Sequence, residues 1–408
     1  MRILVVNKFY WLRGGSERVF FDLAAGYERH GHEVIPFAMQ SPRNRPSAWE
    51  ARFAPEVSWT GGPVKKLRAA AATIHSRPAA ARLRELVRDV RPHVAHLHNF
   101  HHQLSPSIVD VLREEGVPAV HTLHDYKTIC PNYLLYTQGS VCERCRDGRF
   151  HHAVVHRCLN RGLGASVVAA IEMTWHGARR TLERGIRRFV SPSRFLAMKL
   201  QEFGVPDGAV SVVPNGIEPG AFAPAGEPGN GFVAAGRLSR EKGIRTLLHA
   251  VAAVPEAALT VLGTGPLEAE LRLEAQRIAP GRITFGGHLD RPAVLDRVRS
   301  ARALVLPSEW YENAPIAALE AMACGVPVIG SDIGGIPEMV RPGQTGLLFP
   351  PGDAGTLASR LRELEADPAR AHALGCAGRR VVESEYTLAD QVRRMLAILE
   401  EVASSASR

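Results

Sequence analysis

The sequence PSEWYENAPIAALEAMACGVPVIGSD, residues 307–332, contains the signals of one strand–loop–helix–strand unit. The apolar run 303–306 before it predicts a buried strand, and VPVIG predicts another that is apolar on both faces, as a parallel sheet requires. Between the two strands, residues 317–323 are strong helix formers. Pro315 fits the first turn of this helix, because a proline has no N–H to leave unpaired there. Gly325 fits a left-handed cap at the end of the helix. The stretch therefore predicts an α/β protein with a loop at the ligand-binding carboxyl edge of a sheet.

Two carboxylates stand out in this stretch, Glu312 in the loop and Glu320 on the helix. Glu320 has apolar neighbours, and two adjacent sugar hydroxyls would satisfy the oxygens of an ionised carboxylate, which only accept hydrogen bonds. The backbone at the start of the helix suits a phosphate. That backbone set is Asn313, Ala314, Pro315 and Ile316. The residues alone leave open that Glu312 is an ordinary capping acid and Glu320 a surface acid.

The whole pattern from Glu312 to Ile329 resembles the signature of glycosyltransferase family 4: a Glu, seven residues, a second Glu, then E-A-M-A-x-G-x-P-V-I. That family contains retaining, nucleotide-sugar-dependent enzymes with the GT-B fold, and the likeness extends from Arg2 to about Ala397. Family members usually have Glu-Gly-Phe-Gly at the first Glu, whereas this chain has Glu-Asn-Ala-Pro. The resemblance therefore implies the reaction class without specifying the donor sugar.

The length of 408 residues exceeds the size at which one core stops growing, so two domains are expected. The apolar part of MRILVVNKFYW is too short for a signal peptide, and no apolar run reaches membrane-spanning length. Six cysteines in a chain this long do not suggest a secreted disulfide framework. A cytoplasmic enzyme is the expectation.

The charge is uneven along the chain. Residues 1–220 contain 30 Lys and Arg against 19 Asp and Glu, a net +11, and the remainder contains 20 against 22, a net −2. A basic first half suggests an anionic partner such as a lipid-diphosphate acceptor or the inner face of a membrane, although an Arg- and Ala-rich composition alone gives the same excess. No zinc-finger, RNP or basic-zipper pattern supports nucleic acid, which is not expected as a partner.

The first half begins with a predicted strand at 3–6, a loop ending in Gly14-Gly15, and a predicted helix from Ser16 to Tyr27. A glycine pair there lets a ligand approach the backbone closely, and the resemblance implies that Gly15 lies beside the donor diphosphate. Residues 61–92 predict two helices divided by Pro78, whose basic side chains form either a solvated face or a membrane-contact surface. The histidines in VAHLHNFHHQLSP match no metal-binding motif. We interpret this stretch as a polar wall of the acceptor cleft.

His124-Asp125 follows a predicted strand at 119–123. The family carries a His in a V-x-x-x-H-D pattern near the transferred sugar, so the resemblance implies a catalytic role for His124. An adjacent Asp can hold the imidazole in one tautomer, ready to donate to a sugar hydroxyl. A purely structural histidine is the alternative.

An unusual cysteine-containing insert spans residues 128–160. Its cysteines are Cys130, Cys142, Cys145 and Cys158. Four thiolates could hold one tetrahedral zinc, and the separations that flank the C-x-x-C, eleven and twelve residues, would let two loops meet at one ion. Reduced, unliganded cysteines and a regulatory disulfide are the alternatives.

The Gly- and Pro-rich stretch PNGIEPGAFAPAGEPGNG marks an interdomain linker, after which the opening strand–loop–helix pattern recurs. In GRLSREKG, Arg237 and Lys242 lie between a strand and a helix start, where cations oppose the helix dipole unless a diphosphate is bound. The motif matches the family's G-R-x-x-x-x-K-G. The expected domains are 1–218 on the acceptor side, a linker at 219–230, and 231–385 for the nucleotide sugar. A final helix and tail, 386–408, is expected to cross back to the first domain.

The resemblance implies a GT-B enzyme with two Rossmann-like domains facing each other across a cleft, of the hexosyl-transferring type. We expect a UDP- or GDP-sugar donor and a hydroxyl acceptor. The acceptor class that we expect includes lipid-linked acceptors of cell-surface polysaccharide or glycolipid synthesis. Arg237 and Lys242 are expected to stabilise the leaving diphosphate, Glu320 to hold the ribose, and Glu312 and His124 to orient the sugar. No metal is then needed for catalysis, and zinc is expected only as a structural ion.

Other functions are compatible with the same fold. A nucleotide-sugar epimerase would form product from the donor alone, and a glycogen-type phosphorylase would carry a lysine-bound pyridoxal phosphate. A non-catalytic sugar-nucleotide binder would bind the donor without transfer.

Overall fold

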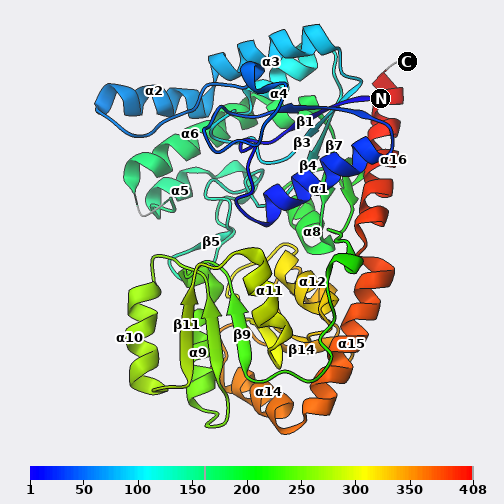
Figure 1. Ribbon diagram of the computed structural model, residues 1–408. Coiled ribbons are helices and arrows are strands. Elements are labelled where there is room, and N and C mark those ends of the chain that lie inside the picture. Colours follow the sequence, from blue (N-terminus) through cyan, green and yellow to red (C-terminus); the bar gives the residue numbers. More distant parts are fainter. Residues whose placement is uncertain (160–161, 407–408) are drawn as a thin grey trace. The chain divides into compact units, whose positions relative to one another are not determined.

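The chain forms two compact units, and a computed structural model describes residues 1–159 and 162–406. Unit 1 contains Met1–Gln138, Cys142–Pro214 and the chain from Leu388 onward, and unit 2 contains Gly139–Val141 and Asn215–Thr387. Each unit is built on one six-stranded parallel sheet (Figure 1). The expected pair of Rossmann-like halves is therefore confirmed. The predicted insert 128–160 and tail 386–408 each end in residues outside the described ranges.

The sheet of unit 1 has the strand order β2-β1-β3-β4-β7-β8, with every neighbouring pair parallel. Its strands are β1 (Arg2–Val6), β2 (Glu33–Phe37), β3 (Val94–Leu97), β4 (Ala119–Thr122), β7 (Ile186–Ser191) and β8 (Val210–Val212). Ile3 of β1 pairs with both Val34 and Val94, so β1 lies inside the sheet. Because helices cover both faces of such a sheet, β3 and β4 are buried throughout.

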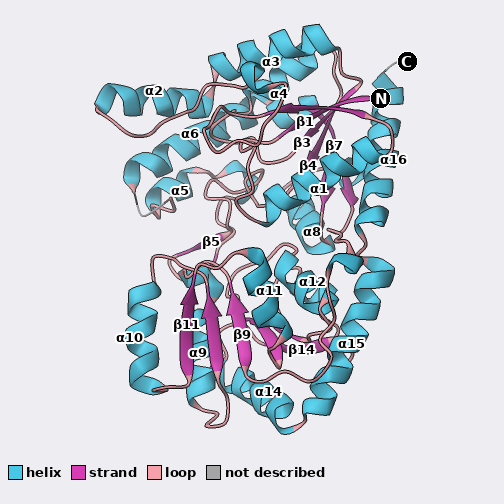
Figure 2. Ribbon diagram, in the orientation of Figure 1, coloured by secondary structure: helices cyan, strands magenta, loops and turns pink. Residues whose placement is uncertain are grey.

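Helices pack on this sheet and extend from it (Figure 2). They are α1 (Gly15–Arg29), α2 (Pro63–Ile74), α3 (Arg77–Val90), α4 (Ser107–Glu114), α5 (His151–Val155), α6 (Leu163–Arg179), α7 (Thr181–Gly185), α8 (Arg194–Glu202) and α16 (Leu388–Ala406). The two helices predicted within 61–92 are α2 and α3. The boundary between them depends on Ser76, whose hydroxyl accepts the Ala79 N–H at the start of α3, and on Pro78 in the first turn.

Helix α16 belongs to unit 1, although the chain reaches it from unit 2. It packs against α1, where Gly26 makes the approach possible: a Cβ at Gly26 would lie 2.4 Å from Val392 Cγ2. Val392, Met395 and Leu399 are buried along one side of α16, as its amphipathic pattern predicts. The expected crossover of the last helix to the first domain is confirmed.

The sheet of unit 2 has the order β11-β10-β9-β12-β13-β14, again parallel throughout. Its strands are β9 (Phe232–Ala235), β10 (Leu259–Leu262), β11 (Ile283–Gly287), β12 (Ala303–Leu306), β13 (Val328–Ser331) and β14 (Gly346–Phe349). Its helices are α9 (Ile244–Ala252), α10 (Glu268–Ile278), α11 (Arg291–Arg299), α12 (Ile316–Ala323), α13 (Ile336–Met339), α14 (Ala354–Ala366) and α15 (Pro368–Glu385). Two apolar clusters form its core, one containing Val305 and the other Leu304, because successive strand side chains point to opposite faces.

Together with β12 directly before it, the segment 307–332 forms the predicted unit of strand, loop, helix α12 and strand β13. Gly325 has φ +71°, its N–H donates to Met322 O, and the Val326 N–H donates to Ala321 O, which together form a Schellman cap. The predicted left-handed cap is confirmed. Pro315 differs from the prediction by one position: it is the extended N-cap residue, and the helix begins at Ile316.

The predicted linker 219–230 is part of unit 2. Phe222 is buried in the core of this unit, and the Ala225 N–H donates to Cys324 O. The stretch is therefore packed against unit 2 and is not a free connection.

The remaining short elements are the strands β5 (Tyr136–Thr137) and β6 (Ser140–Val141) and the 3₁₀ turns η1 (Glu50–Arg52), η2 (Arg146–Gly148), η3 (Asp207–Ala209), η4 (Pro219–Ala221) and η5 (Arg240–Lys242). Within the described ranges, no helix is long and apolar enough to cross a membrane.

Candidate active site

Strand order creates a crevice at the carboxyl edge of the unit 2 sheet. The chain runs from β9 outward to β10 and β11 on one side, then returns to β12 on the other side of β9 and continues to β13 and β14. The loops after β9 and β12 therefore diverge above adjacent strands, which is where open α/β sheets bind ligands. These two loops carry most of the predicted donor-binding residues.

The loop after β9 carries Arg237 and Lys242. Its last turn approaches the β12 loop through Gly243, which has φ +64° and whose Cβ, if present, would lie 1.8 Å from Pro307 O. Only glycine fits both the backbone conformation and the contact. Arg237 is exposed and forms no ion pair with any other residue that the structure describes, so its charge is available to a ligand.

Lys242 and Glu312 form a direct ion pair, with Nζ 2.6 Å from Oε1. The Ser308 hydroxyl also donates to Glu312 Oε1 at 2.7 Å, and Lys242 Nζ lies 5.1 Å from the Trp310 ring centre. Burial by itself would raise the pKa of Glu312, but the charge of Lys242 and these hydrogen bonds outweigh it and hold the pKa below its ordinary value. Glu312 is thus an ionised, buried carboxylate whose cation comes from the other loop.

The backbone at the start of α12 supports only part of the predicted anion site. Pro315 has no N–H, so the candidate amides are those of Asn313, Ala314 and Ile316. The Asn215 side chain donates to Ala314 O at 3.4 Å, and the Gly335 N–H donates to Glu312 O at 2.7 Å. These contacts hold the loop from two sides. The sequence places Asn215 in the Gly- and Pro-rich stretch at the end of the first domain, 1–218, and did not indicate this contact.

Glu320 is half-buried on α12, with Oε1 2.8 Å from Nε of Arg291. Arg291 is the first residue of α11 and lies 5.0 Å from the Phe222 ring centre. The partner that burial demands is therefore an arginine of the same unit. The sequence did not indicate Arg291, because nothing in its local pattern relates α11 to α12.

In unit 1, Gly15 is the first residue of α1 and is exposed, with Gly14 as the extended N-cap. The backbone at this helix start is therefore exposed at the glycine pair, where the sequence predicts that a ligand approaches it closely. Its role toward a donor remains a prediction.

His124 hydrogen-bonds through Nε2 to His98 Nδ1 at 2.9 Å, and the two rings stack. The expected tautomer-fixing partner was Asp125, but its Oδ1 accepts the Lys127 N–H at 2.9 Å instead. Burial lowers the pKa of His124 to about 4 while Asp125 partly opposes the shift, so the imidazole is neutral at physiological pH. A neutral ring donates through only one nitrogen, and His98 sets which one.

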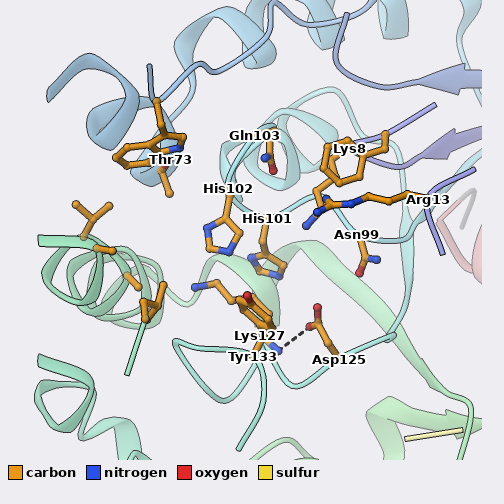
Figure 3. A pocket seen from close by; sticks show the side chains of 16 residues that line it. Lys8, Arg13, Thr73, Asn99, His101, His102, Gln103, Asp125, Lys127 and Tyr133 are labelled. Carbon is orange, nitrogen blue, oxygen red and sulfur yellow. Dashed lines mark hydrogen bonds between the residues drawn. The ribbon is translucent and has the colours of Figure 1, made fainter. Parts of the chain in front are cut away.

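The histidine-rich stretch divides into a structural part and a part that lines a cavity. His96 is buried between the Tyr27 hydroxyl and the Thr122 hydroxyl, 3.0 and 2.7 Å from its ring nitrogens, and is a structural residue. Asn99, His101 and His102 instead line a cavity of about 430 Å³ in unit 1 (Figure 3). The interpretation of this stretch as a polar wall thus applies to its second part.

The four cysteines of the insert are free thiols. Burial raises the pKa of Cys145 to about 12, with further increases from Cys130, Cys158 and Cys142, so the four lie in one neighbourhood. The Cys130 thiol donates to Asn132 Oδ1 at 2.9 Å. Within the described part of the chain, no three His, Cys, Asp or Glu side chains are arranged to hold a metal ion. Zinc therefore stays a prediction that would require these side chains to reorient.

Comparisons with known proteins cover nearly the whole chain. The profile described as Glycosyltransferase Family 4 matches residues 13–220, and the profile described as Glycosyl transferases group 1 matches residues 223–381. The first of these covers half of the chain and most of unit 1.

Two curated relatives illustrate the similarity. A glycogen synthase of Mycobacterium tuberculosis is 35% identical over 193 residues, which are 45% of this chain and 46% of that protein. A GDP-mannose-dependent monoacylated alpha-(1-6)-phosphatidylinositol monomannoside mannosyltransferase of Corynebacterium glutamicum is 34% identical over 170 residues, 40% of this chain and 44% of that protein. The chain thus spans about half the length of the curated relatives it matches.

Among solved structures, the Anabaena protein Alr3699/HepE in complex with UDP and glucose is similar over 98% of this chain and 100% of that chain. The TM-score is 0.69 and the sequence identity 16%, so this likeness bears on the fold alone. It agrees with the two parallel-sheet units described above.

Proposed function

Because the chain belongs to glycosyltransferase family 4, we propose that it transfers a hexose from a nucleoside-diphosphate sugar to a hydroxyl acceptor with retention of the anomeric configuration. The observation that carries the proposal is the Lys242–Glu312 ion pair at the crevice of unit 2. Arg237, which forms no ion pair with another described residue, lies on the same loop as Lys242. A diphosphate would supply the anionic partner that Arg237 lacks and a second one for Lys242, near the start of a helix.

In the proposed reaction, the bond between the anomeric carbon and the diphosphate breaks, and the acceptor oxygen bonds to that carbon on the same face. The acceptor hydroxyl gives its proton to the departing diphosphate. Arg237 and Lys242 stabilise the charge that develops on this leaving group. The proposal assigns no step to a divalent metal, because the two side-chain cations supply that stabilisation.

The carboxylates have separate roles in this proposal. Glu312 orients the transferred sugar together with the neutral His124, and Glu320 accepts hydrogen bonds from the ribose hydroxyls. Donor binding then redistributes two existing contacts: Lys242 shifts part of its interaction from Glu312 to the diphosphate, and Glu320 shares its oxygens between Arg291 and the ribose. The Ser308 hydroxyl keeps Glu312 hydrogen-bonded during this exchange.

The donor nucleotide is UDP or GDP in this proposal, since one relative is named for GDP-mannose and one structural neighbour holds UDP and glucose. The acceptor class is a saccharide or glycolipid of cell-surface synthesis. The basic first half favours an acceptor presented at the inner face of a membrane.

A panel of UDP- and GDP-hexoses tests the proposal. One nucleotide series should raise the melting temperature of the wild-type protein by mass action, and Arg237→Ala should abolish most of that shift. Transfer should fall by a factor that corresponds to roughly 2–4 kcal/mol of transition-state stabilisation in the Arg237→Ala and Lys242→Ala variants.

Arg277→Ala is the matched control, because Arg277 is an exposed arginine of α10 that forms no ion pair with another described residue. Product NMR would report the anomeric configuration. Formation of a new sugar nucleotide without acceptor would instead identify an epimerase, and unchanged binding in both cation variants would refute the diphosphate assignment.

A further inference from the structure

The unit 1 sheet has its own crevice, between β1 and β3. From β1 the chain goes to β2 on one side, and β3 then begins the run toward β8 on the other. The loops after β1 and β3 are tied together, because the Lys8 N–H donates to Asn99 O at 2.7 Å and the Asn99 N–H donates to Asn7 Oδ1 at 3.1 Å. The cavity of about 430 Å³ lies at this point, where open α/β sheets bind ligands.

Three cationic side chains line this cavity. Lys8, Arg13 and Lys127 line it, against one acid, Asp125 (Figure 3). Lys127 is already neutralised, since its Nζ lies 2.8 Å from the buried Glu172 carboxylate. Burial lowers the pKa of Lys8, and the charges of Asp125 and the buried Glu17 partly oppose this shift. Arg13, exposed at the rim, forms no ion pair with any residue in the described ranges.

His101 gives an independent observation that points to a ligand. It is only 6% exposed and lines the cavity, yet neither ring nitrogen has a hydrogen-bond partner among the residues that the structure describes. Its Nδ1 lies 3.7 Å from Glu172, which is too far for a hydrogen bond. A buried polar group without a partner is unfavourable, so a ligand oxygen at this ring would relieve the cost.

The cavity wall also has an apolar side, formed by Phe9, Trp59, Tyr133, Leu159, Ala165, Val168 and Ala169. Phe9 lies between the cations, with Lys8 Nζ 5.5 Å and the Arg13 guanidinium 4.8 Å from its ring centre. His102 and Tyr133 both line the cavity with φ near +60° to +70°, a strained conformation for residues other than glycine. Such strain is retained most often where a binding surface requires it.

From this geometry we propose that the unit 1 cavity binds a phosphoryl group of the acceptor substrate, which is therefore a phosphorylated saccharide or a saccharide diphosphate on an apolar carrier. Donors from two loops converge there, and a phosphoryl group has enough acceptor oxygens to use several of them. The inference rests on the proposed transfer function only in naming the ligand an acceptor.

Titration calorimetry tests the site directly. It uses the Arg237→Gln/Lys242→Gln variant, in which the proposed diphosphate site of unit 2 is removed and cannot contribute to the signal. The probes are glucose 1-phosphate, farnesyl diphosphate, glucuronate and methyl glucoside. At least one phosphoryl probe should bind, more weakly as salt is added, and methyl glucoside should not. Tighter binding of farnesyl diphosphate would assign an apolar carrier, and tighter binding of glucose 1-phosphate a sugar phosphate.

Adding Arg13→Gln should weaken the phosphoryl probe by about tenfold, as expected for one lost charge-assisted hydrogen bond. Arg187→Gln is the matched control: Arg187 is exposed near the amino-terminal end of β7, the opposite edge of the same sheet. A second variant, His101→Gln, tests the buried donor, with circular dichroism to establish folding.

Three results would overturn the inference: no binding of either phosphoryl probe, equal binding of glucuronate, or no effect of Arg13→Gln and His101→Gln in folded proteins. Each differs from failure of the transfer proposal, which would appear as absent nucleotide-sugar binding in the wild-type protein.

Discussion

Replacing Lys242 with methionine would leave the buried Glu312 carboxylate without its cation. Coulomb's law at an effective dielectric of 20 gives about 6 kcal/mol for unit charges 2.6 Å apart, most of which offsets the desolvation of the two groups. The Glu312 side chain is 10% exposed but Lys242 is 29% exposed, so water takes over part of the lost interaction. We expect Lys242→Met to lower the free energy of unfolding at pH 7 by about 1–3 kcal/mol.

The pH dependence of this loss follows from the sign of the Glu312 shift. Its folded pKa lies below the ordinary value of 4.5, because Lys242 and Ser308 outweigh burial. Such a group contributes stability above its unfolded pKa and loses that contribution as the pH falls through the folded value. Without Lys242, less opposes the effect of burial, so the folded pKa of Glu312 should be higher in the variant than in the wild type. The unfolded pKa is the same in both proteins, so the difference between wild type and Lys242→Met should be largest near neutral pH. It should shrink as the pH falls through the folded pKa of the variant toward the lowered folded pKa of the wild type.

Urea unfolding at pH 7 and pH 4 measures both effects, with Glu312→Gln as the matched second background. A glutamine there has no charge to leave unpaired, so Lys242→Met should cost about 0.5 kcal/mol or less in that background. If Lys242→Met has the same effect with Glu312 and with Gln at position 312, the two residues are not coupled, and the ion pair does not hold the crevice together.

The remaining predictions concern the acids, the cysteines and the membrane. Glu320→Gln should raise the KM for all sugars on one nucleotide, whereas Glu312→Gln should affect sugars unequally; the same pattern in kinetics of both variants would contradict their separate roles. Elemental analysis of protein purified without chelator should find about one zinc per chain if the four thiols reorient around an ion, and Cys142→Ser should then increase proteolysis near residue 140. Zinc far below one per chain with four freely titrating thiols would exclude the structural ion. In flotation with anionic vesicles, the protein should bind at low salt and dissociate as salt increases, and no binding at low salt would contradict membrane contact.

Local sequence determined the elements of the fold because their signals lie within a few residues of the structure they specify. The Schellman cap at Gly325 needs only a residue that tolerates positive φ after a run of helix formers, and the apolar run 303–306 becomes β12 over the same four residues. The repeat of strand, glycine-containing loop and helix likewise predicted two sheets. Family motifs then identified Arg237, Lys242 and Glu312 as candidates, although not how they interact.

The tertiary structure decided which of these side chains meet. Lys242 and Glu312 are 70 residues apart and form an ion pair only because β12 lies beside β9, which no local pattern specifies. For the same reason His98 replaced Asp125 as the hydrogen-bond partner of His124, and Arg291 became the partner of Glu320. Pair interactions of this kind depend on strand order and on distances of a few ångströms, whereas hydrophobic periodicity records only which face of each element is buried.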